Sequence, residues 1–297
     1  PNAHLLGDCL EALAKQVDAP PFEVIVPHVV GVAGLEAVQD RHPWVRFLPV
    51  PDVVAHVGGR EHHDVLRARG LAAARGEIVG LLEDHARPDA RWCANVVAAH
   101  QQPYAGVGGA IENGLDHPLN WAVYYCDFGR YQNPVPAGET PYASDANVTY
   151  KRADLERVRP VWEGAFREVV VNGALKSEGR GIALDPRIVV YQHRRGLNLA
   201  TALRERFVWG RSYAATRRAL LTGPKRFIHA ALSPLLPAVL LLRMARTSWD
   251  RGSIRSFVKA VHFTILLLVT WSAGEGIGYL LGLDGKAARV ASPARTS

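Results

Sequence analysis

Residues 70–92, GLAAARGEIVGLLEDHARPDARW, decide the fold class. An Ala- and Arg-rich helix, expected over residues 64–75, is followed by Gly76, a residue favoured just past a helix end. Residues 77–82 (EIVGLL) then predict a buried strand, and residues 89–100 predict another helix that starts after Pro88. Two acids and an imidazole, Glu83-Asp84-His85, lie directly after the strand.

The flanking sequence continues this alternation of helix and strand. We expect a helix over residues 5–15 and strands over residues 22–26, 45–50 and 106–111. Such alternation implies a largely parallel sheet covered by helices. In sheets of this kind the ligand lies at the carboxyl ends of the strands, which is where Glu83-Asp84-His85 falls.

Three ordered blocks resemble the family 2 glycosyltransferases. They are residues 70–92, residues 144–158 (SDANVTYKRADLERV) and residues 166–195, and the resemblance covers about residues 4–195. It implies an α/β protein with the GT-A nucleotide-diphospho-sugar transferase fold, a mostly parallel sheet flanked by helices. Two departures stand out. The family opens with an apolar strand and a nucleotide-contacting loop, which we expect to be missing here. In the family an Asp usually follows the second strand, where this chain has Pro27-His28.

The resemblance implies a metal-dependent, inverting transfer of a sugar from a nucleotide diphosphate. Such a reaction needs a cation on the diphosphate and a base for the acceptor hydroxyl. The implied metal ligands, for Mn²⁺ or Mg²⁺, are Asp84 and His85. Donor contacts are expected from Glu83 to the ribose and from Arg67 and His193 to the phosphates. The expected catalytic base is Glu168, and the expected acceptor-binding residues are Asp145, Asn147 and Trp121, the last in an aromatic-rich stretch that equally suits a core.

The charge is divided unevenly along the chain. Residues 1–193 contain 18 Lys and Arg against 24 Asp and Glu, whereas residues 194–297 contain 17 against 4, so the net charges are −6 and +13. A basic tail suits nucleic acid or a membrane. The tail is also strongly apolar and has no groove-reading motif, so we expect membrane lipids, not nucleic acid, as its partner. The three cysteines are too far apart for a zinc site or a disulfide framework.

The tail predicts a helical membrane-associated region over residues 196–285 and a flexible end over residues 286–297. Residues 199–221 are typical of an interfacial helix on anionic lipid. Residues 227–242 are short for a span and favour a re-entrant or interfacial helix, whereas residues 260–283 would reach about 36 Å, enough to cross a bilayer. Five Lys and Arg residues between these stretches indicate the cytoplasmic side of the inner membrane.

Two other functions are compatible with the sequence. A polyprenyl-phosphate sugar synthase would use an already ionised lipid phosphate as nucleophile and would not need a strong base. A degenerate transferase could instead act as a membrane scaffold that binds a sugar nucleotide without catalysis. The main hypothesis is the glycosyltransferase that acts on a glycan or lipid-linked hydroxyl.

Overall fold

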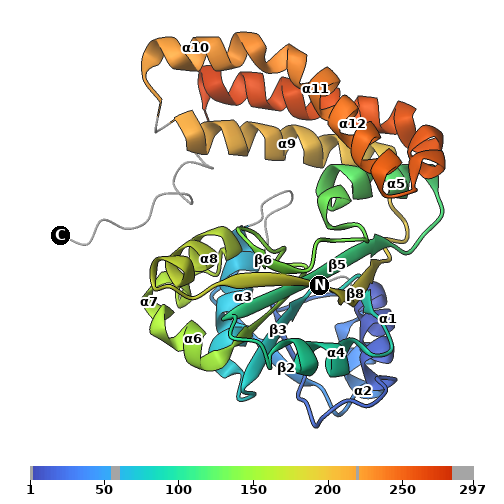
Figure 1. Ribbon diagram of the computed structural model, residues 1–297, viewed down its shortest axis with the longest axis vertical. Helices are drawn as coiled ribbons and strands as arrows, with labels where there is room; N and C mark the ends of the chain where they lie inside the picture. Colours follow the sequence, from blue (N-terminus) through green and yellow to red (C-terminus); the bar gives the residue numbers. More distant parts are fainter. Residues whose placement is uncertain (1–2, 55–60, 219–220, 283–297) are drawn as a thin grey trace. The chain divides into compact units, whose positions relative to one another are not determined.

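The computed structural model describes residues 3–54, 61–218 and 221–282. The chain divides into two compact units, and Figure 1 shows both. The first comprises residues 1–115 and 130–195, and the second comprises residues 116–129 and 196–297. In this division residues 116–129 are grouped with the tail, and the expected domain over residues 1–195 stays a prediction.

The first unit is a sheet flanked by helices, which confirms the α/β class. Its elements follow in the order α1 (Ala3–Ala14), β1 (Ile25–His28), α2 (Leu35–Arg41), β2 (Arg46–Pro49), α3 (Glu61–Ala73), β3 (Ile78–Leu82), β4 (Ala86–Pro88), α4 (Trp92–Ala99), β5 (Gly106–Asn113), β6 (Gly138–Thr140), β7 (Asn147–Lys151), α6 (Arg152–Arg157), α7 (Arg159–Trp162), α8 (Glu168–Ser177) and β8 (Ile182–Gln192), with a 3₁₀ turn, η1 (Gly129–Tyr131), before β6.

The expectation of a mostly parallel sheet is wrong. The described residues form a six-stranded sheet in the order β3-β7-β5-β8-β4, with β6 also pairing with β8. In this sheet only β5 and β8 are parallel. The other pairs are antiparallel, because β7 returns between β3 and β5 and the short strands β4 and β6 fold back onto β8. Strands β1 and β2 form a separate parallel pair.

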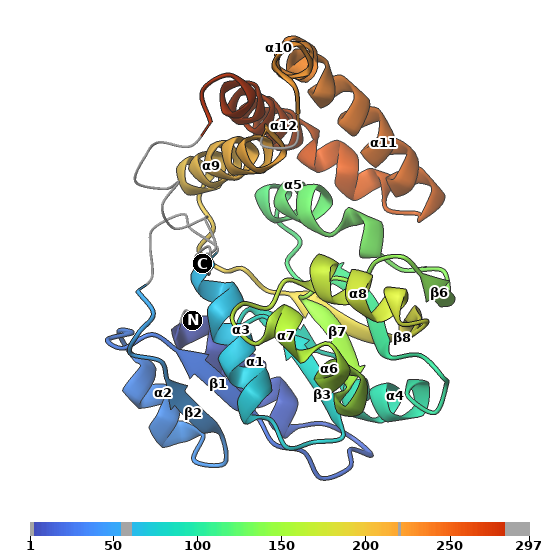
Figure 2. The same cartoon turned by 90° about the vertical axis from the view of Figure 1, so that its left-hand side faces the viewer.

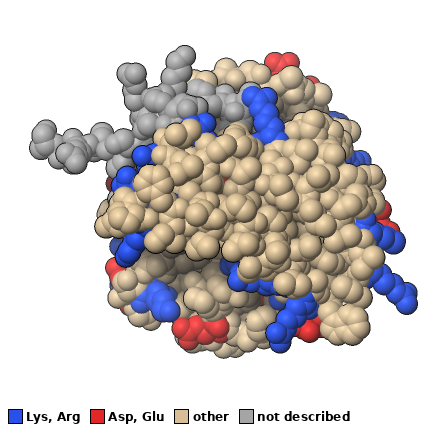
Figure 3. Space-filling view, turned by 90° about the horizontal axis from the view of Figure 1, so that it is seen from above, with Lys and Arg blue, Asp and Glu red and all other residues tan. Residues whose placement is uncertain are grey.

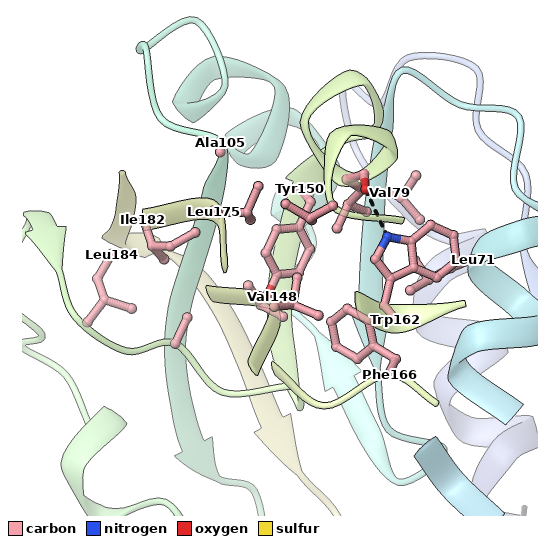
Figure 4. Packing of buried hydrophobic residues seen from close by; sticks show 14 of the residues in the cluster. Leu71, Val79, Ala105, Val148, Tyr150, Trp162, Phe166, Leu175, Ile182 and Leu184 are labelled. Carbon is pink, nitrogen blue, oxygen red and sulfur yellow. Dashed lines mark hydrogen bonds between the residues drawn. The ribbon is translucent and has the colours of Figure 1, made fainter. Parts of the chain in front are cut away.

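A hydrophobic cluster holds α7 and α8 against the sheet. Trp162, Phe166 and Leu175 are at most 1% exposed and pack with Tyr150 of β7, as Figure 4 shows for the central residues. The Trp162 indole Nε1 donates to the Leu155 carbonyl oxygen at 2.8 Å, so the aromatic ring is buried without an unpaired donor. This packing fixes the start of α8, where Glu168 lies.

A second cluster fixes the parallel pair β1–β2. Leu6 and Leu10 of α1 and Val38 of α2 pack with Val26 of β1, and Figure 2 shows these elements together. Partly buried Leu82, the last residue of β3, packs against the same cluster. The end of β3 is therefore held from the side of α1 as well as by its pairing with β7.

The pairing of β5 with β8 contains a bulge that Asn147 fills. The register shifts between Gly109 and Ala110, so that Gly109 pairs with Asp185 while Ala110 pairs with Val189. Asn147 Nδ2 donates to the carbonyl oxygens of Ala110 and Ile188, at 2.8 and 3.0 Å. A Cβ at Gly109 would overlap the Ile188 carbonyl oxygen, so only glycine fits this position.

Helices are the only secondary-structure elements in the described residues of the second unit. It consists of α5 (Pro118–Asp127), α9 (Leu199–Arg218), α10 (Gly223–Leu232), the 3₁₀ turn η2 (Ser233–Leu235), α11 (Leu236–Asp250) and α12 (Ile254–Leu281). Helices α9 and α12 touch through backbone. Cβ atoms added at Gly274 and Gly278 of α12 would overlap the carbonyl oxygens of Phe207 and Arg211 on α9.

Two helical runs of the second unit are long and apolar enough to cross a membrane by length and composition. They are Gly223–Asp250 and Ile254–Leu281, each of 28 residues. The first run continues through η2 and extends at both ends beyond residues 227–242, the uncharged stretch that is short for a span. Residues 286–297, expected to be a flexible end, lie outside the described residues.

Candidate active site

The polar residues selected from the sequence gather at one edge of the six-stranded sheet. Leu82, the last residue of β3, pairs with Asn147, the first residue of β7. Because this pair is antiparallel, Asp84 and Asp145 lie just beyond the paired ends, on the same edge of the sheet. The carboxyl ends of β5 and β8 meet at this edge too, since Asn113 pairs with Gln192.

His85 lies between the two acids that precede it. Its Nδ1 donates to Asp84 Oδ1 at 2.9 Å, and its Nε2 lies 3.3 Å from Glu83 Oε2. Gln192 Nε2 donates to the same Glu83 oxygen at 3.1 Å. Burial opposes the charged form of His85, but Glu83 and the hydrogen bond to Asp84 together raise its pKa. The triplet is thus a compact group in which the two carboxylates favour the protonated form of the ring.

His193 lies beside this triplet and is neutral. Its backbone N–H donates to the His85 carbonyl oxygen at 2.8 Å. Burial, with Arg87 and Arg195 nearby, lowers the pKa of His193 to about 4. Its buried Nδ1 has no hydrogen-bond partner among the described residues. The ring packs onto Gly114, where an added Cβ would overlap it, so the ring position depends on that glycine.

Arg67 joins α3 to the start of β7. One of its guanidinium nitrogens, Nη1, lies 2.7 Å from Asp145 Oδ2 and 3.5 Å from Asp64 Oδ1. Asp64 also accepts from Arg167 Nε at 3.2 Å. Burial raises the pKa of Asp64, although both arginines act in the opposite direction. Two cations and two carboxylates therefore form one network at the sheet edge.

Glu168 is the first residue of α8 and half-buried. The preceding segment is fastened to α3, since Phe166 N–H donates to the Asp64 carbonyl oxygen at 2.8 Å. Burial, together with the charges of Glu168 and Asp145, raises the pKa of Tyr131 to about 12. Both acids thus act on one phenol, which places Glu168 and Asp145 in the same neighbourhood.

Sequence reasoning missed three residues of this network: Asp64, Arg167 and Tyr131. Asp64 falls in the run EHHD and Arg167 precedes the expected base, but neither position carries a motif. Tyr131 belongs to the aromatic-rich stretch, yet its proximity to the acids depends on packing between η1 and α8, which no local pattern reveals.

One expected acceptor-binding residue, Asn147, is not found at the surface of this group. Asn147 is fully buried, and its Oδ1 accepts from Trp92 Nε1 at 3.0 Å while its Nδ2 fills the bulge. With both ends of the amide engaged in the core, Asn147 does not bind an acceptor in this conformation. Trp121 lies in the second unit, where it stacks on Tyr125 and donates from Nε1 to Asp116 Oδ1 at 2.8 Å. Its role in acceptor binding stays a prediction.

The side chains at this site would hold a divalent cation only if substrate phosphates supplied further ligands. Among the residues that the structure describes, no group of three or more His, Cys, Asp or Glu side chains is arranged to hold a metal ion. Mg²⁺ and Mn²⁺ are commonly held by one or two carboxylates together with water and substrate phosphates, and Asp84 suits that role. His85 has only Nε2 to offer, because Nδ1 is engaged by Asp84, and a metal there must displace a proton.

Comparison with solved structures reveals the same fold in glycosyltransferases. The chain resembles the mannosyltransferase PcManGT from Pyrobaculum calidifontis, solved with GDP-Man and Mn²⁺. The TM-score is 0.54 at 19% sequence identity, covering 95% of this chain and 85% of that one. The chain shares its fold with PcManGT. TarS from S. aureus, residues 1–349, aligns with a TM-score of 0.45 at 14% identity, over 90% of this chain and 87% of that one. No protein-family model and no curated protein sequence matches the chain.

Proposed function

We propose that the protein is a metal-dependent, inverting glycosyltransferase of family 2 type. It moves a sugar from a nucleotide-diphosphate donor to a hydroxyl of a glycan or lipid-linked acceptor. The observation that carries this proposal is the meeting of two polar groups at one sheet edge: the triplet Glu83-Asp84-His85, and the network of Arg67, Asp145 and the start of α8. The shared fold with PcManGT supports it.

In this proposal the triplet and its neighbours bind the nucleotide-sugar donor. Asp84 would hold a divalent cation, with Nε2 of neutral His85 as a second ligand; when bound, such a cation neutralises the charge that develops on the diphosphate leaving group. Glu83, held by Gln192, would bind the ribose. His193 has an unpaired, neutral ring nitrogen beside the triplet, which suits a hydrogen bond to a phosphate. Arg67 would exchange part of its pairing with Asp145 for the diphosphate, as a guanidinium can bind two oxygens at once.

In this proposal Glu168 deprotonates the acceptor hydroxyl and Asp145 orients it. A carboxylate at the start of α8 can take the proton of the attacking hydroxyl while that oxygen bonds to the anomeric carbon. Attack from the face opposite the diphosphate breaks the sugar–phosphate bond in a single displacement and inverts the configuration. Asp145 would orient the acceptor hydroxyl, and its ion pair with Arg67 holds its carboxylate in position.

The composition of the second unit supports an association with a membrane. We propose that the catalytic unit faces the cytoplasm at the inner membrane and that the lipid partners are anionic. Two helical runs of sufficient length and apolar composition, and the basic residues between them, support this location.

Calorimetry tests the donor half of the proposal. Full-length protein in the presence of Mn²⁺ should bind a nucleoside diphosphate, and Asp84→Ala should weaken this binding at least about tenfold. The control is Asp52→Ala, which removes an exposed acid that pairs with Arg69 away from the triplet. Absence of nucleotide binding to the wild type, across uridine, guanosine and thymidine diphosphates, would overturn the enzyme proposal.

A donor screen tests the reaction itself. Purified full-length protein with Mn²⁺ or Mg²⁺ should slowly hydrolyse at least one nucleotide sugar, and a chelator should stop the reaction. Hydrolysis that persists unchanged after chelation would contradict metal dependence while leaving sugar transfer in place.

A further inference from the structure

From the second unit, we propose that its helices insert into one leaflet of an anionic phospholipid bilayer and do not cross it. This deepens the membrane association proposed above and does not depend on glycosyl transfer. The membrane-facing surface is the outer side of α10, η2, α11 and α12. Helix α9 lies on the other side of α12 and remains outside the lipid.

Helix α9 cannot follow α12 into hydrocarbon. It has five arginines and one glutamate within 20 residues, and Arg204 and Arg217 are exposed. Charged side chains at membrane depth are costly unless they are paired or lie in a water-filled cavity. Arg206 is paired with Asp127 of α5 through two hydrogen bonds, but that pair leaves the other arginines of α9 to be placed in water or among headgroups.

Helix α12 cannot enter the bilayer interior without α9. The glycines Gly274 and Gly278 bring the two backbones into contact, and Gly210 of α9 meets the Trp271 carbonyl oxygen in the same way. Ala202 of α9 also belongs to one hydrophobic cluster with Ala260 and Leu267 of α12. Because α9 accompanies α12 along most of its length, a spanning α12 would place the charges of α9 at membrane depth.

The run α10–η2–α11 has an apolar stripe on its surface. No residue that the structure describes covers this stripe. Ile228, Leu232, Leu235, Val239 and Leu242 follow each other at intervals of four and three residues, so they share one helix face. Each is more than half exposed, and α10 contains no buried residue at all. Exposed apolar area of this extent on a soluble surface indicates a partner.

Charge at the two ends of the stripe identifies that partner as anionic lipid. Lys225 and Arg226 precede it, and Arg243 and Arg246 follow it, while the 16 residues between them contain no Lys, Arg, Asp or Glu. Figure 3 shows this side of the second unit as a broad uncharged field with Lys and Arg along its margins. Sixteen helical residues extend about 24 Å, which is shorter than the roughly 30 Å hydrocarbon core. Cations at both ends fit a helix that lies in the plane of one headgroup layer.

Vesicle binding tests the lipid-facing surface. Full-length protein should float with vesicles of phosphatidylcholine and phosphatidylglycerol, and Leu242→Asp should weaken this binding at least tenfold. Thr216→Asp is the matched control, because it adds the same charge at an exposed position of α9. Both positions are on the surface, so unchanged circular dichroism establishes that both variants fold. Equal loss of binding in the two variants would overturn the assignment of the membrane face.

Cysteine labelling separates insertion from crossing. Lys225→Cys and Arg255→Cys mark opposite ends of the run Gly223–Asp250, in a Cys126→Ser background where Cys9 and Cys93 are buried. In inside-out vesicles from cells that express the full chain, a membrane-impermeant maleimide should label both cysteines before detergent is added. Labelling of one of the two only after detergent would show that the run crosses the membrane and would overturn the proposal.

Size-exclusion chromatography without lipid tests whether a second copy covers the surface instead. A dimer that Leu242→Asp converts to monomer, together with no vesicle flotation of the wild type, would overturn the proposal. A failure of nucleotide binding in the calorimetry above would leave all three of these results unaffected, so the two proposals fail separately.

Discussion

At the scale of single residues, Glu168 occupies a position that stabilises its charged form. The first turn of a helix favours a carboxylate through its unpaired N–H groups and the helix dipole. The charges of Glu168 and Asp145 both raise the pKa of Tyr131, so these two acids lie in the same neighbourhood. The structure thus identifies the neighbours of Glu168, whereas in the sequence its role as a base is implied only by the family resemblance.

Replacement of Glu168 by Gln distinguishes the two enzyme functions. If a hydroxyl is the acceptor, kcat should fall about 10²-fold or more, because the amide cannot take the proton. If a lipid phosphate is the acceptor, the loss should be small. The measurement is initial rate at saturating donor, and Glu163→Gln, an exposed acid paired with Arg159, is the control. Equal losses in both variants would exclude Glu168 as a base.

At the scale of secondary-structure elements, Asn147 connects three parts of the first unit. Its amide joins the indole of Trp92 on α4 to the bulge between β5 and β8. This explains why a residue expected at the acceptor site lies in the core: it opens β7, a central strand whose first four residues are all buried.

Asn147→Ala should destabilise the protein by about 3 kcal/mol or more. The change leaves the Trp92 N–H and two carbonyl oxygens without their partner, and a buried unsatisfied group costs about 1–3 kcal/mol. Urea unfolding of the full-length protein measures the difference, with Gln101→Ala, which removes an exposed amide just after α4, as the control. A loss below about 1 kcal/mol would contradict the assigned role.

His100, the residue that follows α4, makes stability depend on pH. Its Nε2 donates to Thr149 Oγ1 at 2.8 Å, and that hydroxyl donates to the Val107 carbonyl oxygen. Burial, assisted by Lys151, lowers the pKa of His100 to about 4. Its Nδ1 is buried without a partner in the described structure, so a proton there would find no acceptor.

The free energy of unfolding should therefore fall as the pH drops from about 6.5 to 4. Above the unfolded-state pKa of about 6.5, His100 is neutral in both the folded and the unfolded state. Below it, His100 binds a proton in the unfolded state but not in the folded state. One such group contributes a slope of at most about 1.4 kcal/mol per pH unit. Denaturant unfolding across this range should give a shallower slope for His100→Gln. Identical slopes would show that His100 does not titrate differently in the two states.

The sequence predicted the order of the elements around β3 well, because strong local signals mark them. Gly76, the apolar run to Leu82 and Pro88 each act within a few residues. The antiparallel return of β7 and the bulge at Gly109 were not predictable, since strand direction and register depend on pairing across the chain. Likewise, Glu83-Asp84-His85 was visible as a motif, whereas Asp64 and Arg167 meet only through the contact of α3 with the start of α8.

At the scale of the whole molecule, the first and last parts of the sequence differ in charge. Residues 1–193 have a net charge of −6 and residues 194–297 a net charge of +13. A cation bound with the donor phosphates suits the first, and anionic headgroups suit the second. The total of +7 conceals this division.

Binding to anionic vesicles should weaken as the ionic strength rises. Salt screens the contacts of Lys225, Arg243 and their neighbours with headgroups, since the screening length is about 10 Å at 0.1 M salt. Binding through the apolar stripe should remain, so high salt should reduce flotation without abolishing it. Sedimentation with phosphatidylcholine vesicles alone, expected to be weak and salt-independent, provides the comparison. Complete release by salt would mean that the apolar stripe does not enter the lipid.

The bulge filled by Asn147 also constrains which substitutions the protein tolerates together. Trp92 needs an acceptor, the bulge needs a donor, and Gly109 leaves the space that lets both reach one amide. Changes at these positions are therefore energetically coupled, and their effects on stability should not add. A library that varies residues 92, 109 and 147 one at a time would record three intolerant sites. A library that varies them jointly could recover combinations that keep β7 in register, and with it Asp145 at the sheet edge.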